Sequence, residues 1–409
     1  MLGPMSLGRS FHVLLGANAA SNLADGLAFV SIPLLAASLT SDPRLVAGLA
    51  TVYALVRLLV ALPIGVWVDR ADRRTLLAVA NLLRGVAILA LAVCLLAGIE
   101  GLVLLYVAFG ILGTFESAAD NAAVSLIPSY VHDRDLDRAN GRISATQLVT
   151  DEFVGPPLGG LLFAVAATAP VFMMGGLWAV AGFLALALPR ALKRPTTGAE
   201  RSSLSALWTE ASEGLRWTAQ NRVVGALALV GALASVGYML PFSILVLFAQ
   251  DRLGVDATQY GLILAVSALG GLAGSFLTGR LRARFGYRTT IAGSLLTGAI
   301  SLFALAATTE PILAAILLAI YILHGVVWGI CATSLRQRLV PENLRGRVNA
   351  GSRVLGLTGL AIGSIAGGVL AAVDLTLAVA AGGLVFVACA VIALILIRTN
   401  DGQPPAAAQ

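Results

Sequence analysis

A few charged residues interrupt long apolar stretches of the sequence, and they are the first candidates for chemistry. Asp25, Arg57 and Glu116 each fall near the middle of such a stretch. Glu152 stands beside Asp151 in another one. Burial drives a carboxyl group toward its neutral form and a nearby arginine favours the charged form, so such a group can bind and release a proton. The candidates for proton coupling are Asp25, Glu116, Glu152 and Arg57.

A permanent ion pair that fixes helix packing is the alternative for these residues, and we favour it for Arg57. Two further polar residues are expected to have structural roles. Arg84 lies three turns into its stretch and is expected to extend its side chain to the membrane boundary. His324 can titrate near neutral pH, but a hydrogen-bonded packing role is favoured.

A short charged motif separates the second and third apolar stretches. The motif contains Gly65, Asp69, Arg70, Arg73 and Arg74. Asp120, in the fourth apolar stretch, is the acid expected to pair with its arginines. Asp69 can meet the positively polarised N-terminus of a helix near residues 349–353, while the arginines pair with Asp120 or lipid phosphates. This contact is expected to close one side of a membrane protein. The alternative is that the arginines merely orient the hairpin, which requires neither Gly65 nor Asp69.

A glycine–proline motif lies in the fifth apolar stretch, directly after the two acids. Its members are Gly155, Pro156, Gly159 and Gly160. Proline removes a hydrogen-bond donor from the helix, and the glycines remove side chains from one face. The motif therefore predicts a kink and a close contact with another helix. General helix packing, without a specific transport role, is the alternative.

The elements that position these residues are predicted by composition. The 409 residues are 58% hydrophobic and 12% charged, about half the charge of a soluble domain, and the mean hydropathy is +0.91. About 20 apolar residues span a bilayer as a helix. Twelve such runs cover residues 11–39, 45–68, 75–98, 101–127, 143–167, 170–189, 222–250, 259–280, 289–308, 311–335, 350–373 and 375–397. We expect an all-α membrane protein with twelve transmembrane helices.

The arginines between the runs predict the orientation. With the N-terminus inside, nearly all of them fall in cytoplasmic loops, and only Arg44 and Arg252 lie outside. Both termini are then cytoplasmic. The long polar stretch at 191–221 is expected to be a cytoplasmic loop whose residues 203–220 form an amphipathic helix on the membrane surface. We expect six-helix bundles at 1–190 and 222–409.

Two motifs recur in the second half of the chain. Residues 65–74 correspond to 279–288, an offset of 214, with Ala283 in place of Asp69. Residues 155–160 correspond to 363–368, an offset of 208. The first motif, Gly-x-x-x-Asp-Arg-x-x-Arg-Arg, resembles the loop 2–3 signature of the major facilitator superfamily. This resemblance implies two pseudo-symmetric six-helix bundles with substrate held between them at mid-membrane.

Two further sequence segments are similar to one branch of that superfamily. Residues 126–141 and 336–349 resemble loops of bacterial exporters in the macrolide-efflux and enterobactin-exporter group. The glycine–proline motif resembles the helix 5 signature of drug/proton antiporters, although Asp151 stands where those proteins have glycine. The resemblance implies proton-driven efflux of hydrophobic or amphipathic small molecules, with a role in multidrug resistance. It also implies a monomer in the bacterial plasma membrane, in contact with membrane lipids.

Other functions remain as alternatives. The runner-up is a facilitator or symporter for a specific metabolite, siderophore or lipid, and a remote alternative is a receptor or scramblase. Lys193, the only lysine, lies in no phosphate-binding loop, and no metalloprotease or nucleophile-elbow motif is present. We therefore expect neither an enzyme nor a cofactor or metal site. Loop arginines account for the net charge of +6, so no nucleic-acid partner is expected.

Overall fold

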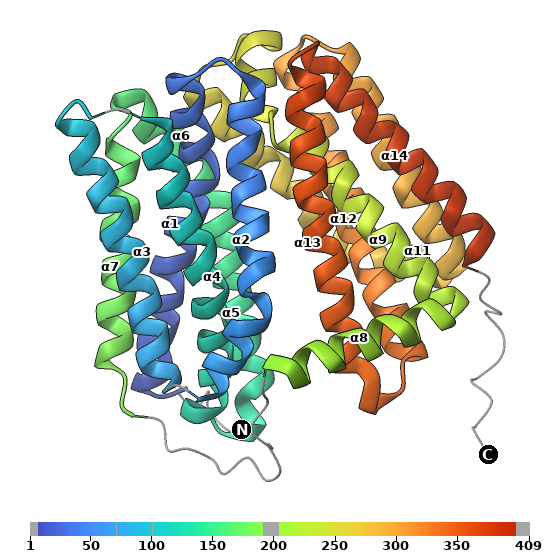
Figure 1. The fold of residues 1–409 in the computed structure, drawn as a ribbon, viewed down its shortest axis with the longest axis horizontal. Helices are drawn as coiled ribbons and strands as arrows, with labels where there is room; N and C mark the ends of the chain where they lie inside the picture. Colours follow the sequence, from blue (N-terminus) through green and yellow to red (C-terminus); the bar gives the residue numbers. More distant parts are fainter. Residues whose placement is uncertain (1–6, 71, 100, 191–203, 398–409) are drawn as a thin grey trace, which may run out of the picture. The chain divides into compact units, whose positions relative to one another are not determined.

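The protein is an all-helical, multi-pass membrane protein in its described regions. The computed structural model describes residues 7–70, 72–99, 101–190 and 204–397, apart from the side chains of 61–70, 133, 204–211 and 343. Every regular element in these ranges is a helix (Figure 1). Eleven helices among the described residues are long and apolar enough to cross a membrane. The predicted fold class is therefore confirmed.

The helices follow the predicted apolar runs closely. In the first half they are α1 (Arg9–Leu39), α2 (Pro43–Arg70), α3 (Arg73–Leu96), α4 (Leu102–Tyr130), α5 (Leu136–Gln147), the π-helix η2 (Leu148–Val154), α6 (Gly155–Val165) and α7 (Ala169–Ala187). The later ones are α8 (Leu204–Gln220), α9 (Arg222–Phe242), α10 (Leu245–Leu247), the π-helix η3 (Phe248–Arg252), α11 (Ala257–Ala307), α12 (Pro311–Leu339), α13 (Arg345–Ala371) and α14 (Leu375–Leu396).

Helix α11 accounts for two of the twelve predicted runs. It contains 51 residues, and its backbone breaks at Gly286, where φ is 72° and ψ is 173°. Glycine adopts a positive φ without the steric cost that other residues meet. At the corresponding place in the first half, Asp72 caps α3 and accepts a hydrogen bond of 3.2 Å from the Arg74 backbone N–H. The two halves thus reverse direction by different local means.

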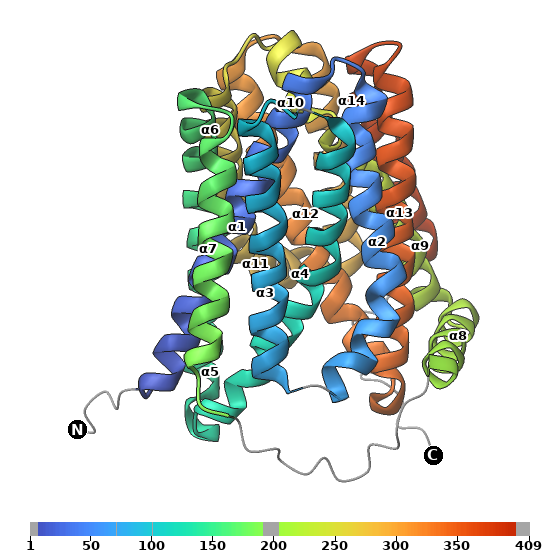
Figure 2. The same cartoon turned by 60° about the vertical axis from the view of Figure 1, so that its left-hand side comes forward.

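Contacts between residues divide the chain into two compact units. The first unit comprises Met1–Ser41, Val52–Leu207 and Val255–Ala265, and the second comprises Asp42–Thr51, Trp208–Gly254 and Val266–Gln409. In the first unit α3 lies between α4 and α7, and α1 packs on α7 and α6 (Figure 2). In the second unit α9 packs on α13, α14 and α12.

Two helices begin in one unit and continue in the other. The start of α2, within Asp42–Thr51, belongs to the second unit, and the start of α11, within Val255–Ala265, belongs to the first unit. In the second unit the Thr51 hydroxyl lies 2.8 Å from that of Ser364, and a methyl group at Gly368 would lie 3.0 Å from Arg44 Cα. In the first unit a methyl group at Gly160 would lie 2.3 Å from the carbonyl oxygen of Ala257. Gly160 and Gly368 are related by the 208-residue offset, so the sequence repeat extends to these contacts.

The amphipathic helix expected at 203–220 is present as α8. It docks on α13, where Glu213 and Arg347 form an ion pair with an O–N distance of 2.7 Å. A methyl group at Gly214 would lie 2.4 Å from the Arg347 carbonyl oxygen, so the two helices meet closely. Trp217 packs against a cluster formed by the buried side chains of Val224, Val340 and Val348. Part of the apolar face of α8 is therefore covered by protein.

Candidate functional site

Arg57 of α2 and Glu116 of α4 form an ion pair inside the first unit. Arg57 Nη1 lies 3.4 Å from Glu116 Oε1, and the two side chains are 26% and 18% exposed. The hydroxyl of Tyr53, one helical turn before Arg57, donates to the other carboxylate oxygen, Oε2. Arg57 Nη1 lies 3.4 Å from the Tyr53 hydroxyl oxygen as well. Two side chains from one face of α2 therefore hold Glu116.

Tyr53 is a member of this site that sequence reasoning missed. Its ring stacks on Phe109 of α4 with the ring centroids 4.8 Å apart. A methyl group at Gly113 would lie 2.9 Å from ring carbon Cδ2, so glycine leaves the space that Tyr53 occupies. The spacing of four residues between Tyr53 and Arg57, which puts both on one helix face, was the available signal.

Asp25 of α1 forms the second ion pair of the first unit, with Arg84 of α3. The Nη2 group of Arg84 donates to Asp25 Oδ1. Arg84 is 1% exposed, so the expectation that it extends to the membrane boundary is wrong. A guanidinium buried this deeply needs a carboxylate partner. The two pairs are separate, although the charges of Asp25 and Arg57 attract each other.

Side chains from α1, α3 and α7 complete the burial of Arg84. Its Cζ atom lies 4.4 Å from the ring centroid of Trp178, which is itself fully buried. Arg84 Nη1 lies 3.4 Å from the hydroxyl oxygen of Ser21, and this hydroxyl donates to Asn81 Oδ1 over 2.9 Å. The guanidinium thus combines an ion pair, a cation–π contact and a polar network.

The neighbouring acids Asp151 and Glu152 lie in the π-helix η2. Glu152 is exposed, whereas Asp151 is half-buried and interacts electrostatically with Asp25. π-Helical turns are frequent at functional sites. Asp151 is therefore a candidate residue that the sequence analysis did not select. Its position in the place of a glycine of the helix 5 signature was the signal.

Glycines bring α1 and α6 into backbone contact beside these acids. A methyl group at Gly26 would lie 2.3 Å from the Asp151 carbonyl oxygen, and one at Gly155 would lie 2.6 Å from Gly26 Cα. A methyl group at Gly159 would lie 3.1 Å from the carbonyl oxygen of Leu27 in α1. Pro156 is the second residue of α6, which directly follows the π-helical turn η2 within the continuous span Leu136–Val165, so the widened turn lies where proline supplies no N–H donor. The motif therefore places Asp151 directly against α1.

The charged motif between α2 and α3 is described only in part. The side chains of Asp69 and Arg70 lie outside the description, and Gly65 is described only as part of α2. Arg73 Nη1 donates to the carbonyl oxygen of Ser125 over 3.1 Å, and Arg74 Nε donates to that of Ala185 over 3.3 Å. Asp120 is exposed, and its charge attracts Arg57. The hydrogen bonds of Arg73 and Arg74 thus link α3 to the ends of α4 and α7.

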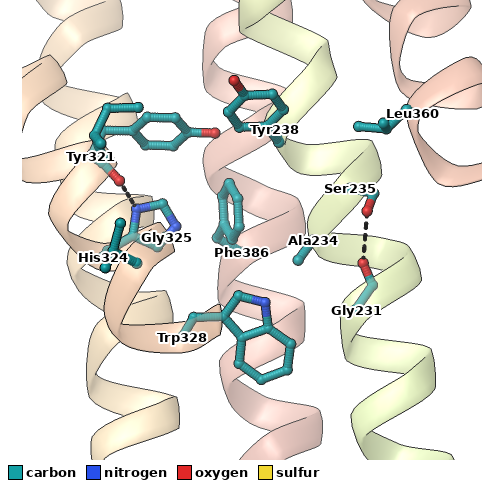
Figure 3. A pocket seen from close by; sticks show the side chains of 12 residues that line it. Gly231, Ala234, Ser235, Tyr238, Tyr321, His324, Gly325, Trp328, Leu360 and Phe386 are labelled. Atoms are coloured by element: carbon teal, nitrogen blue, oxygen red, sulfur yellow. Dashed lines mark hydrogen bonds between the residues drawn. The ribbon is translucent and has the colours of Figure 1, made fainter. Parts of the chain in front are cut away.

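The second unit contains an apolar pocket with a volume of about 340 Å³ (Figure 3). Aromatic side chains from three helices line it, namely those of Tyr238, Tyr321, His324, Trp328 and Phe386. No Asp, Glu, Lys or Arg is among the described residues that line it. His324 is 2% exposed, and its Nδ1 atom shares a hydrogen bond with the Tyr321 carbonyl oxygen, as a packing role requires.

The membrane-spanning helices and the repeated glycine contacts define a membrane transporter of the major facilitator type. The chain belongs to the transmembrane secretion effector family of this superfamily, whose family model matches residues 2–407. It is a transporter rather than an enzyme.

Two relatives are exporters or resistance proteins. The chain is 30% identical over 263 residues to the class C tetracycline resistance protein of Escherichia coli, and the match covers 64% of each chain. That is slightly less than two thirds of this relative's length. The chain is also 28% identical over 348 residues to the enterobactin exporter EntS of Shigella boydii, and this match covers 83% of the chain and 80% of EntS.

Solved structures share the fold. A bacterial homologue of the iron transporter ferroportin in its inward-facing state matches with a TM-score of 0.74 and 22% identity, over 95% of this chain and 99% of that one. The nucleoside transporter NupG matches with a TM-score of 0.76 and 12% identity, over 95% and 98%. At these identities the similarity concerns the arrangement of helices alone.

Proposed function

We propose that this protein exports hydrophobic or amphipathic small molecules by proton antiport, through alternating access. The observation that carries the proposal is the pair of carboxylate–arginine contacts inside the membrane-spanning first unit, Asp25–Arg84 and Glu116–Arg57. The exporter relatives support the direction of transport. The arginine distribution supports an orientation with both termini in the cytoplasm. The bacterial relatives support a place in the bacterial plasma membrane, and we propose that the protein acts there as a monomer.

Glu116 is the acid best placed to couple protons to substrate. While ionised, it accepts hydrogen bonds from Tyr53 and Arg57. A proton on Glu116 cancels its charge, so Arg57 loses its carboxylate partner. The Nε atom of Arg57 is buried and has no hydrogen-bond partner among the described residues, so the guanidinium has spare capacity to turn toward another acid such as Asp25. Protonation would thereby reorganise contacts between helices and favour another state of the transporter.

Transport against a gradient tests this coupling. A resistance panel in a pump-deficient host identifies a substrate, and proteoliposomes with an imposed pH difference then measure its accumulation. Glu116→Gln should still exchange substrate at equilibrium but should not accumulate it, since an amide cannot release a proton. Glu310→Gln is the matched control, because Glu310 is exposed at the start of α12. A protonophore should abolish accumulation by wild type.

The outcome that contradicts proton coupling is specific. If Asp25→Asn, Glu116→Gln and Glu152→Gln all accumulate substrate as wild type does, these acids do not couple protons. A uniporter or another coupling ion then becomes the better interpretation.

The charged motif of residues 65–74 is proposed to gate the cytoplasmic side. Asp69 at the end of α2 would meet the N-terminal part of α13 near residues 349–353. Arg70, Arg73 and Arg74 would pair with Asp120 or with lipid phosphates. The hydrogen bonds of Arg73 and Arg74 to carbonyl oxygens support a role for the arginines in holding helix ends.

Asp69→Asn tests the gate, because it removes the charge and keeps the size. The variant should insert normally but lose most transport, since it favours the inward-open state. Cysteine accessibility on the cytoplasmic side should rise in parallel. Transport at the wild-type rate would reduce the motif to a topology signal.

A second candidate function is transport of one specific metabolite or siderophore. The similarity to enterobactin exporters over 83% of the chain favours it. The resistance panel separates the two functions. Protection against several unrelated apolar compounds supports broad efflux, whereas no protection together with secretion of a single compound supports the specific carrier.

A further inference from the structure

The apolar pocket of the second unit has the composition of a site for an uncharged ring system. It lies among α9, α12, α13 and α14, and its volume of about 340 Å³ is at the lower end of the range for ligand pockets. That volume holds one ring system rather than a whole large amphipathic molecule. A charged group would enter without a counter-ion, because no Asp, Glu, Lys or Arg is among the described residues that line the pocket.

The aromatic rings form a wall and an edge. Tyr238 and Tyr321, which line the pocket, lie nearly parallel at an angle of 11° and form the wall. Phe242, which is not among the described lining residues, stacks on Tyr238 with the ring centroids 4.4 Å apart. Phe386 stands edge-on to Tyr321 and to His324, at 76° and 82°. Aromatic pairs favour offset stacks and edge-to-face contacts. A flat ligand can therefore stack on the parallel wall and meet the edge of Phe386.

One buried polar group in the pocket lacks a partner. Tyr321 is 1% exposed, and its hydroxyl has no hydrogen bond within the described part of the chain. Figure 3 shows this hydroxyl pointing toward Tyr238, across the top of the pocket. Tyr238 is only partly buried, and a ligand reaches the Tyr321 hydroxyl when the Tyr238 side chain rotates away from it. A phenolic hydroxyl donates better than it accepts, because its lone pair is delocalised into the ring.

We propose that this pocket binds a flat, uncharged aromatic group that carries a carbonyl or phenol oxygen, which accepts a hydrogen bond from Tyr321. The remainder of the transported molecule extends beyond the pocket. This inference rests on the proposed export function and specifies the substrate class for it. A buried hydroxyl without a partner is costly, so a ligand oxygen that satisfies it adds to affinity as well as orientation.

Prodan, a flat naphthalene ketone, is a suitable probe because its emission moves to longer wavelength when its carbonyl accepts a hydrogen bond. Purified protein in detergent is titrated with Prodan, and the signal of protein-free micelles is subtracted. Tyr321→Phe should bind about three- to tenfold more weakly and lose the long-wavelength emission. Tyr287→Phe, the same change at a buried tyrosine of this unit outside the pocket, should behave as wild type.

A second variant fills the pocket. Gly231 lines it, and a methyl group there meets no atom within 4 Å, so Gly231→Leu should fold and weaken Prodan binding by at least about tenfold. Gly293→Leu is the matched control, because Gly293 also has open space around it and lies outside the pocket. Unchanged binding in Gly231→Leu overturns the site. Unchanged emission and affinity in Tyr321→Phe overturn the hydrogen bond and the oxygen-bearing class.

The binding measurement is made at equilibrium without a proton gradient, so it is independent of coupling. If Prodan binds as expected while the acid variants accumulate substrate normally, the pocket stands and proton antiport fails. If the acid variants lose accumulation while Prodan binds Gly231→Leu as it binds wild type, the proposed function stands and the aromatic subsite fails.

Discussion

In the first unit, Arg84 of α3 lies against Trp178 of α7. The repeat gives each of these residues a counterpart in the second unit. Arg84 corresponds to Gly298, at the offset of 214 found for residues 65–74, and Trp178 corresponds to Phe386, at the offset of 208 found for residues 155–160. A methyl group at Gly298 would lie 2.5 Å from His324 Nε2, so the His324 ring occupies space that a longer side chain at 298 would fill. The ring of His324 stands edge-on to Phe386 with centroids 4.8 Å apart.

The acid of the first unit is also replaced. Gly159 and its repeat Gly367 approach the carbonyl oxygens of Leu27 and Leu240, and this offset of 213 relates Asp25 to Tyr238. Tyr238 is part of the aromatic wall. An ion pair in one half of the repeat thus becomes an aromatic cluster in the other, while the glycine contacts of α6 and α13 are kept. The repeat specifies backbone packing, and the side chains at its centre are free to differ. A charged centre responds to protons, whereas an uncharged one suits apolar ligands.

The largest effect expected from this comparison is at Arg84. Arg84→Met leaves Asp25 buried without its partner and should lower the free energy of unfolding by about 3–5 kcal/mol. SDS titration of the purified protein in mixed micelles measures this change. Adding Asp25→Asn should restore most of the stability, because no unpaired charge remains.

The double variant Arg84→Met, Asp25→Asn also tests which contact of Arg84 carries the stability. If the double variant is as unstable as Arg84→Met, the cation–π contact with Trp178 and the polar network around Ser21 carry the stability instead of the ion pair.

A smaller effect is expected at the corresponding position of the second unit. Gly298→Ala pushes on the His324 ring and should cost about 1–3 kcal/mol in the same titration, as overpacking does. Gly293→Ala, on the same helix with no atom within 4 Å, should change stability by less than about 1 kcal/mol and in the stabilising direction. Equal results for both variants would show that His324 is not held against Gly298.

Much of the fold was predictable because the signals are local or periodic. Apolar runs of membrane length placed the helices, and α11 was divided correctly because basic residues around Gly286 interrupt its hydrophobicity. An ion pair was one interpretation of Asp25, Arg57 and Glu116, but the sequence did not select the acid that Arg57 contacts, which is Glu116. The partner of Arg84 was not predicted, because an arginine three turns into an apolar stretch has the same sequence pattern whether its side chain extends to the boundary or pairs with a buried acid.

The role of Asp151 was missed for a similar reason. Two adjacent acids look alike in sequence, and only the π-helical turn of η2 and the contact with Gly26 leave Asp151 half-buried and Glu152 exposed. The aromatic pocket had no sequence signature either. Its members come from α9, α12 and α14, and their spacing along the chain carries no common period.

The sequence by itself determined that this protein is a helical membrane transporter built from a repeat. Hydrophobic length and repeated glycine motifs are properties of contiguous residues, which act before any tertiary contact forms. Only the tertiary structure decided that Arg84 pairs with Asp25 and that the buried Tyr321 hydroxyl has no hydrogen-bond partner among the described residues. The strength of an electrostatic or hydrogen-bonding interaction depends on which groups from distant helices share a buried space, and packing alone sets that arrangement.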